Sequence, residues 1–242
     1  VILGDRATKL LNKIVTDTPD KKYDTIVDIG CGTGVVTQML AHRLMVDHIY
    51  GIDIDSGVIE FARDTHNESN IQYINQDISA EWHELAPGLR ALEGRVSLVF
   101  SSACFQWIDN KRNAMKNIYR LLENGGKICA DIMQIPDLFE GFPDMYEKFT
   151  GNLQNIPTKV QQMNVWSDLF QESNLKIISQ EFILENHTIP EKAFKDHFMP
   201  MLMCLWAKYW IDYSKVRDEV QHLIYGQVVP NMPKFIDDKT DE

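Results

Sequence analysis

The sequence predicts an α/β fold in which a doubly wound, mostly parallel sheet carries helices on both faces. Strand and helix patterns alternate through the first 135 residues, and a glycine-rich turn follows the first strand. Acidic residues follow the next two strands. Alternation of this kind is typical of parallel strands joined by crossover helices. Ligands of such sheets bind outside the carboxyl ends of the strands, so functional residues are expected there.

Each element of this core has a local signal. The helices carry apolar residues at helical spacing, as at Ala114, Ile118 and Leu121, and the strands are short apolar runs that end in turn residues. The pair Gly125-Gly126 is expected to end the last helix of the core. In chain order the prediction is helix 5–16, strand 25–29, helix 36–44, strand 48–54, helix 56–65, strands 71–75 and 97–101, helix 111–122 and strand 127–132.

The pattern changes after Pro136. A helix is expected at 159–172 and a strand at 176–184, and residues 136–242 are interpreted as an embedded helical substrate cap with the remaining sheet elements. The chain is thus predicted to be one domain, with its cofactor-binding core in residues 1–135. The apolar, Met-rich stretch 194–213 could line a pocket for an apolar acceptor, because Met and aromatic side chains suit irregular apolar surfaces. It could equally be a buried cap helix.

Composition excludes several classes of function. The net charge of -11 weighs against a nucleic-acid substrate, since phosphate binding requires a basic face. The four cysteines form no CxxC pair and no disulfide framework, which predicts no metal site and favours a reducing, cytoplasmic compartment. No stretch of about 18 apolar residues predicts a membrane span. The oligomeric state is left open.

The turn after the first strand has the spacing GxGxG, formed by Gly30, Gly32 and Gly34. Glycines at alternate positions allow a tight turn and a close approach of the backbone to a ligand. In the dinucleotide fingerprint GxGxxG the third glycine packs the helix near a pyrophosphate, but Val35 stands in that place. A ligand with a carboxylate and an amino group is therefore favoured over a pyrophosphate. Asp28, before the glycines, could accept a hydrogen bond from an ammonium group.

Two further strand ends carry carboxylates. Asp53 ends the second strand about 20 residues after the loop, the position at which an acid binds the ribose hydroxyls of a nucleotide. Asp77 follows the third strand and could accept a hydrogen bond from the amino group of adenine, with Ile78 against the ring. Together these elements predict a site for an adenosine-containing ligand.

The runs VDIGCGTG, GIDID and NQDIS resemble the first three motifs of class I methyltransferases, and this resemblance covers residues 23–135. It implies a Rossmann-like fold and S-adenosylmethionine as the methyl donor, with S-adenosylhomocysteine as the product. It also implies that the glycines line the methionine part, that Asp53 holds the ribose, and that Asp77 and Ile78 hold adenine. The full predicted cofactor-binding set is Asp28, Gly30, Cys31, Gly32, Gly34, Asp53, Ile54, Asp77, Ile78 and Ser102.

The segments FQWI and NIYRLLENGG resemble a narrower group, the insect juvenile hormone acid methyltransferases and the bacterial trans-aconitate methyltransferases. This resemblance implies that the acceptor is a small-molecule carboxylic acid, with an apolar, isoprenoid-like acid expected. A carboxylate is ionised at neutral pH, so it needs no strong general base. Trp107 and Gln106 are predicted as the catalytic residues, which would orient the acceptor oxygen through hydrogen bonds.

Three alternatives stay open at this point. A hydroxyl or amine acceptor would need a base, for which His187 and His197 are candidates. A catalytically degenerate relative that only binds the cofactor is suggested by Leu3, which stands where the insect group has a Gln that orients the substrate. A nicotinamide-dependent dehydrogenase is disfavoured by the glycine spacing and by Asp77.

Overall fold

The computed structural model describes residues 2–133, 159–181 and 183. The chain divides into two compact units, one made of Val1–Gln134 and Met163–Ile177 and the other of Ile135–Gln162 and Ile178–Glu242. The sheet belongs to the first unit. The stretch 194–213, with its two interpretations, and the candidate bases His187 and His197 lie outside the described residues.

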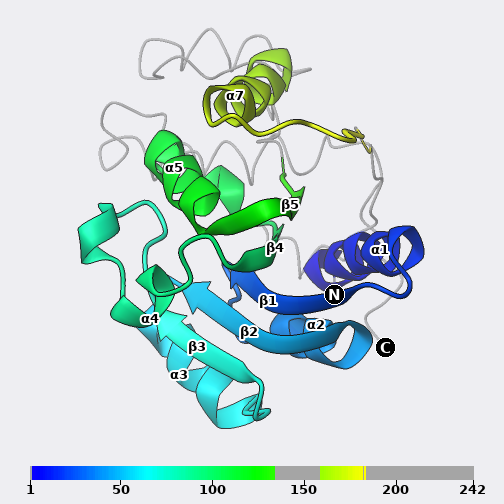
Figure 1. Ribbon diagram of the computed structural model, residues 1–242, viewed down its shortest axis with the longest axis vertical. Helices are drawn as coiled ribbons and strands as arrows, with labels where there is room; N and C mark the ends of the chain where they lie inside the picture. The colour runs from blue at the N-terminus through cyan, green and yellow to red at the C-terminus, as the bar shows by residue number, and fades with distance from the viewer. Residues whose placement is uncertain (1, 134–158, 182, 184–242) are drawn as a thin grey trace, which may run out of the picture. The chain divides into compact units, whose positions relative to one another are not determined.

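Five parallel strands form one sheet in the order β3-β2-β1-β4-β5 (Figure 1). The strands are β1 (Lys22–Ile29), β2 (Met45–Asp53), β3 (Ile71–Asn75), β4 (Val96–Ser102) and β5 (Leu122–Asp131). From β1 the chain winds outward to β3 and then returns to the other side of β1 for β4. The switch point therefore lies between β1 and β4, and the predicted doubly wound α/β fold is confirmed.

Helices cover both faces of this sheet. On one face, α1 and α2 pack over apolar residues of β1, β2 and β4, and the main buried cluster on the other face includes residues of α4 and α5. The α-helices are α1 (Ile2–Asp17), α2 (Val35–Arg43), α3 (Ser56–Thr65), α4 (Pro87–Arg90), α5 (Lys111–Leu121) and α7 (Lys159–Glu172). Two 3₁₀ turns, Trp82–Glu84 and Phe105–Trp107, complete the connections.

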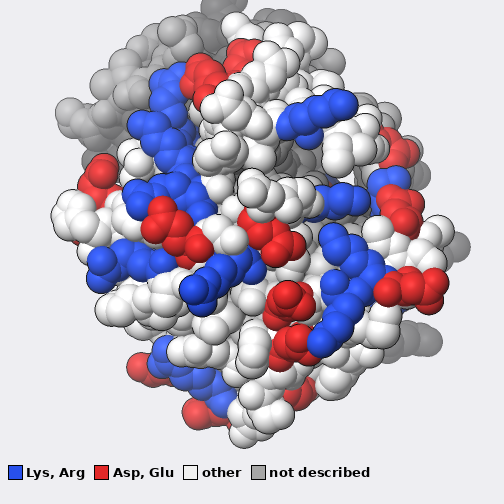
Figure 2. Space-filling model, viewed as in Figure 1, with Lys and Arg blue, Asp and Glu red and all other residues white. Residues whose placement is uncertain are grey.

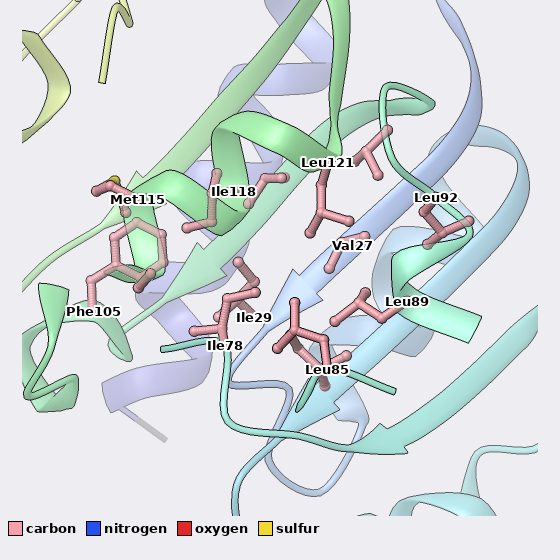
Figure 3. Close-up of a cluster of buried hydrophobic side chains, with 14 of the residues drawn as sticks. Val27, Ile29, Ile78, Leu85, Leu89, Leu92, Phe105, Met115, Ile118 and Leu121 are labelled. Carbon is pink, nitrogen blue, oxygen red and sulfur yellow. The ribbon is translucent and has the colours of Figure 1, made fainter. Parts of the chain in front are cut away.

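Figure 3 shows the apolar cluster under α5, which joins Val27 and Ile29 of β1 to Ile118 and Leu121 of the helix. These four side chains are at most 2% exposed. Burying each such side chain contributes about 1.5–3 kcal/mol to folding. The cluster lies directly behind the strand end that carries the glycine loop, so it fixes that end rigidly.

On the face drawn in Figure 2, basic and acidic side chains are interspersed. The helix α5 carries several of the cations, but Arg112 pairs with Glu172 and Arg120 pairs with Glu93, in both cases at 2.8 Å. These exposed pairs contribute at most about 1 kcal/mol each. None of the helices in the described part of the chain is long and apolar enough to cross a membrane.

Two local predictions are wrong. The helix α5 ends at Leu121, ahead of the glycine pair, because Leu122 already adopts an extended backbone and begins β5. Gly126 is needed for another reason: a Cβ there would lie 2.7 Å from the carbonyl oxygen of Val96, next to a register shift between β4 and β5. The expected strand at 176–184 is also not formed, since residues 176–181 and 183 have no strand pairing.

Two asparagine side chains of α5 hold the loop that follows β3 through hydrogen bonds to its backbone. The Nδ2 atom of Asn117 donates to the carbonyl oxygens of Ile78 and Ala80, both at 2.8 Å. One turn earlier, Asn113 donates to Ser79 and Ala80. Asn117 is only 2% exposed, so water cannot readily replace its hydrogen bond to Ile78, whereas Ala80 also accepts from Asn113.

We therefore expect Asn117→Leu to lower the free energy of unfolding by about 1–3 kcal/mol, because the buried carbonyl oxygen of Ile78 loses the hydrogen bond from Asn117. Urea unfolding followed by circular dichroism measures this difference. The matched control is Lys116→Leu, the exposed neighbour, which should change stability little. Equal stability of the Asn117 variant and the wild type would show that these hydrogen bonds do not stabilise the fold.

Candidate functional site

The glycine loop between β1 and α2 needs its three glycines for different reasons. All three have positive φ angles, of 74° at Gly30, 53° at Gly32 and 85° at Gly34. A Cβ on Gly30 would lie 2.4 Å from the Cβ and Sγ atoms of Cys104, and one on Gly34 would lie 2.6 Å from the hydroxyl of Tyr73. A Cβ on Gly32 would meet no described atom within 4 Å. Gly32 thus presents bare backbone to open space, as close ligand approach requires.

Asp28 lies beneath this loop and is 2% exposed. Its Oδ2 accepts a hydrogen bond of 2.7 Å from the hydroxyl of Thr37 on α2. The pKa of Asp28 is raised to about 7, chiefly by burial; the hydrogen bond from Thr37 lowers this pKa, and the nearby charge of Asp53 adds to the rise. A cation bound beside Asp28 would favour its ionised form.

Asp53 connects the first two strand ends. Its Oδ2 accepts from the backbone N–H of Gly32 at 3.0 Å, and its Oδ1 accepts from that of Asp55 at 3.0 Å. From β3, the side chain of Asn75 donates to the carbonyl oxygens of Asp53 and Ile54. Ile54 is 70% exposed. The end of β2 thus offers a fixed carboxylate next to an apolar side chain open to a flat ligand.

Asp77 and Ile78 differ in how they face the site. The Oδ1 atom of Asp77 accepts from both the N–H and the hydroxyl of Ser79 at 2.7 Å, which forms a tight turn after β3. Ile78 is 4% exposed and packs among Ile29, Leu85 and Phe105 in the core (Figure 3). Contact of its side chain with an adenine ring stays a prediction.

The turn after β4 abuts the glycine loop through Cys104. It contains Ala103 in a left-handed conformation, with a φ of 52°. The side chain of Gln106 is 8% exposed; its Nε2 donates to the carbonyl oxygen of Ala103 at 2.7 Å, and its Oε1 accepts from the N–H of Met133 at 3.4 Å. Gln106 therefore holds the turn together, while Trp107 is half-buried in the 3₁₀ turn beside it.

Burial raises the pKa of the two thiols at the loop. The pKa of Cys104 rises to about 12, and that of Cys31 rises further, with Asp28 as the second cause after burial. Both thiols therefore stay protonated at neutral pH, which argues against a nucleophilic role. Among the described residues, no group of three or more His, Cys, Asp or Glu side chains could hold a metal ion.

Sequence reasoning missed a pair of charged residues at the other edge of the sheet. Arg6 of α1 forms a two-point ion pair with Asp131, the last residue of β5. Ser102, the last residue of β4, donates to the same carboxylate at 3.3 Å. No local pattern could reveal this pair, because 125 positions separate Arg6 from Asp131.

Comparison with known proteins agrees with this geometry. Residues 27–130 match the family model described as a methyltransferase domain. The malonyl-[acyl-carrier protein] O-methyltransferase of Acetivibrio thermocellus is 34% identical over 113 residues, which cover 47% of this chain and 37% of that protein. The trans-aconitate 2-methyltransferase of Rhizobium rhizogenes is 26% identical over 173 residues, covering 71% and 58% respectively. The resemblance to the trans-aconitate enzymes is thereby confirmed, whereas that to the insect group stays a prediction.

Solved structures agree on the fold. The YcgJ protein of Bacillus subtilis matches with a TM-score of 0.56 at 13% identity, covering 82% of this chain and 83% of that one. A Methanococcus maripaludis protein described as an S-adenosyl-L-methionine-dependent methyltransferase matches with a TM-score of 0.53 at 19% identity, covering 76% and 83%.

The chain spans about two fifths of the length of the first curated relatives, 37% of one and 42% of another. The match lies over the sheet, the glycine loop and the acidic strand ends described above. Residues 27–130 of this chain are thus similar to a methyltransferase domain.

Proposed function

We propose that this chain methylates a carboxylate oxygen of a small acid, with an apolar, isoprenoid-like acid as the preferred acceptor. The observation that carries the proposal is the row of ligand-accessible groups along the strand ends: open backbone at Gly32, the Asp53 carboxylate and the exposed Ile54. Two relatives support an acidic acceptor, because they are named for malonyl and trans-aconitate substrates.

The residues at the strand ends fit the cofactor. Gly32 would approach the methionine part, Asp53 would bind the ribose hydroxyls, and Ile54 would cover the adenine ring, with Asp77 at the amino group. Asp28, Gly30, Cys31, Gly34, Ile78 and Ser102 complete the proposed binding set. When bound, S-adenosylmethionine supplies a methyl group on a sulfonium, which gives S-adenosylhomocysteine when the methyl leaves.

The strand-end loops hold neither a histidine nor a thiolate that could act as a general base, which favours a carboxylate acceptor. The loops 29–34, 53–56, 75–80 and 102–108 contain no histidine, and both thiols there are held protonated. A carboxylate is ionised at neutral pH and attacks without losing a proton. The remaining task is alignment and exclusion of water, which we assign to Trp107 and, through the turn that it braces, to Gln106.

We expect Asp53→Ala to weaken S-adenosylhomocysteine binding about 10- to 100-fold, because a charged acceptor of hydrogen bonds is worth about 1.5–3 kcal/mol. Isothermal titration calorimetry measures the affinity, with Glu60→Ala on the exposed side of α3 as the matched control. NADH serves as a ligand control and should not bind. Unchanged affinity of the Asp53 variant would remove Asp53 from the site.

The two glycines Gly32 and Gly30 should respond differently to alanine. Both substitutions strain a left-handed backbone by about 1–2 kcal/mol, but only Gly30→Ala also collides with Cys104. Gly32→Ala should therefore fold while losing at least about tenfold in S-adenosylhomocysteine affinity. Gly30→Ala should lose more stability in thermal unfolding. Wild-type affinity in the Gly32 variant would show that the ligand does not approach this backbone.

Trp107→Phe should lower the turnover of an accepted acid about 10- to 100-fold, since its ring N–H can no longer orient the acceptor oxygen. Binding of S-adenosylhomocysteine should stay unchanged. Trp82→Phe, in the 3₁₀ turn that follows β3, provides the control. If the kcat of the Trp107 variant equals that of the wild type, Trp107 is a packing residue.

A further inference from the structure

A buried hydrogen bond joins the first strand of the sheet to the helix that follows the glycine loop. The hydroxyl of Thr37 on α2 donates to Asp28 Oδ2 at 2.7 Å. Thr37 is fully buried and Asp28 is 2% exposed, so water competes little for this bond. A threonine hydroxyl has a single hydrogen, and here the carboxylate receives it. Oδ1 is a second acceptor on the same carboxylate.

Tyr73 of β3 restrains Thr37 and the glycine loop together. Its hydroxyl donates to the carbonyl oxygen of Gly34 at 3.4 Å. Burial raises the pKa of Tyr73, and a side-chain hydrogen bond with Thr37 acts in the opposite direction. The ring fits because Gly51 of β2 has no side chain, since a Cβ there would lie 2.7 Å from a ring carbon. Thr37 thus interacts with both Tyr73 and Asp28, which limits the rotation of its hydroxyl.

The titratable groups around Asp28 do not favour its charged form. Those that interact with it electrostatically are all acids, namely Asp53 of β2, Cys31 of the glycine loop, Tyr73 of β3 and Cys104 of the turn after β4. An acid cannot supply a positive charge, and the charge of Asp53 raises the pKa of Asp28. Of the groups that the described part of the chain places around Asp28, Thr37 is therefore the one that favours its ionised form.

A ligand ammonium group beside Asp28 requires the ionised carboxylate. The pKa of Asp28 is about 7, so the protonated and ionised forms coexist near neutral pH. Removing a donor to this carboxylate disfavours the ionised form more than the protonated form, because hydrogen bonds to charged groups are the stronger ones. Loss of the Thr37 hydroxyl should therefore leave less of the protein in the form that binds a cation.

Resting on the cofactor site proposed above, we infer that Thr37 is a positioning residue of that site, whose hydroxyl holds Asp28 as the carboxylate that receives the ammonium group of S-adenosylmethionine. Thr37 acts through Asp28, since its own side chain is buried. A residue that merely packs α2 against the sheet would act through its shape, which Val shares with Thr. The positioning role depends on the hydroxyl hydrogen.

The test is the pH dependence of S-adenosylhomocysteine binding to the full chain, measured by isothermal titration calorimetry. Wild-type affinity should rise with pH and level off above about pH 7, because the protonated form of Asp28 must first lose its proton. Thr37→Val should move this rise upward by about one pH unit. At about pH 6 the variant should then bind about tenfold more weakly, and at about pH 8.5 within about threefold of the wild type.

Three further variants separate the hydroxyl from the shape. Thr37→Ser keeps the donor and should follow the wild-type profile. Asp28→Asn cannot ionise, so its binding should be weak and should not rise with pH. The matched control is Thr65→Val, an exposed threonine of α3 whose hydroxyl donates to the carbonyl oxygen of Phe61. It should change neither the affinity nor the profile.

A measurement on the wild type keeps the inference testable even if Thr37→Val does not fold. Titrations in buffers of different ionisation enthalpy count the protons released on binding. The wild type should release about one proton at about pH 6 and almost none at about pH 8.5. Binding without proton release at the lower pH would overturn the positioning role.

The remaining outcomes distinguish this inference from the proposed function. A Thr37→Val profile that coincides with the wild type, or that is lowered equally at every pH, would overturn the role of the hydroxyl and leave the cofactor site standing. A wild-type chain that does not bind S-adenosylhomocysteine would overturn the proposed function, and the inference with it.

Discussion

The strand β1 is the constraint on which the site depends. It pairs with β2 on one edge and β4 on the other, and five of its eight residues form an unbroken buried run at its carboxyl end. A slip of one residue would move each of these side chains to the opposite face and disrupt the packing of both apolar clusters. The carboxyl end of β1 therefore stays fixed. It sets the positions of Asp28, of the glycine loop and of the neighbouring ends of β2 and β4.

That arrangement concentrates negative charge on the cofactor side. Asp28, Asp53 and Asp77 belong to the ends of three successive strands, and the buried Asp28 carries the cost in its raised pKa. A buried carboxylate without a cation is unfavourable, so such a cluster is best suited to a ligand with positive charge. S-adenosylmethionine has two cationic groups, an ammonium and a sulfonium. The electrostatics of the strand ends thus favour this cofactor independently of the sequence resemblance.

The sequence predicted what depends on neighbours along the chain. The strand at 71–75 and the helices at 56–65 and 159–172 have the predicted bounds, because apolar periodicity and turn residues define them locally. The end of α5 was wrong because Gly125-Gly126 looks like a helix terminus, whereas the glycines serve the packing against β4. The described residues of the expected strand at 176–184 have no strand pairing, because a local apolar run cannot show whether another strand lies beside it.

Contacts between residues that are distant in the sequence could not be predicted from local patterns either. The asparagine clamp of α5 and the Arg6–Asp131 pair join segments that approach each other only after the sheet has formed. Gln106 illustrates the difference most clearly. Its position in FQWI suggested a group that touches the acceptor, but its amide is bonded to the backbone of Ala103 and Met133. The structure therefore shows Gln106 as a brace of this turn.

The charged side chains at the carboxyl ends of the strands differ between the two sides of the switch point. At the ends of β1 and β2, the carboxylates of Asp28 and Asp53 would favour a cationic ligand; at the end of β5, Asp131 is paired with Arg6. In the proposed reaction, an anionic acceptor would be attracted by the sulfonium of the cofactor. Methyl transfer between these partners removes both charges, since a sulfonium and a carboxylate become a thioether and an ester. Charge neutralisation of this kind is favoured in a shielded site, because burial disfavours separated charges more than water does.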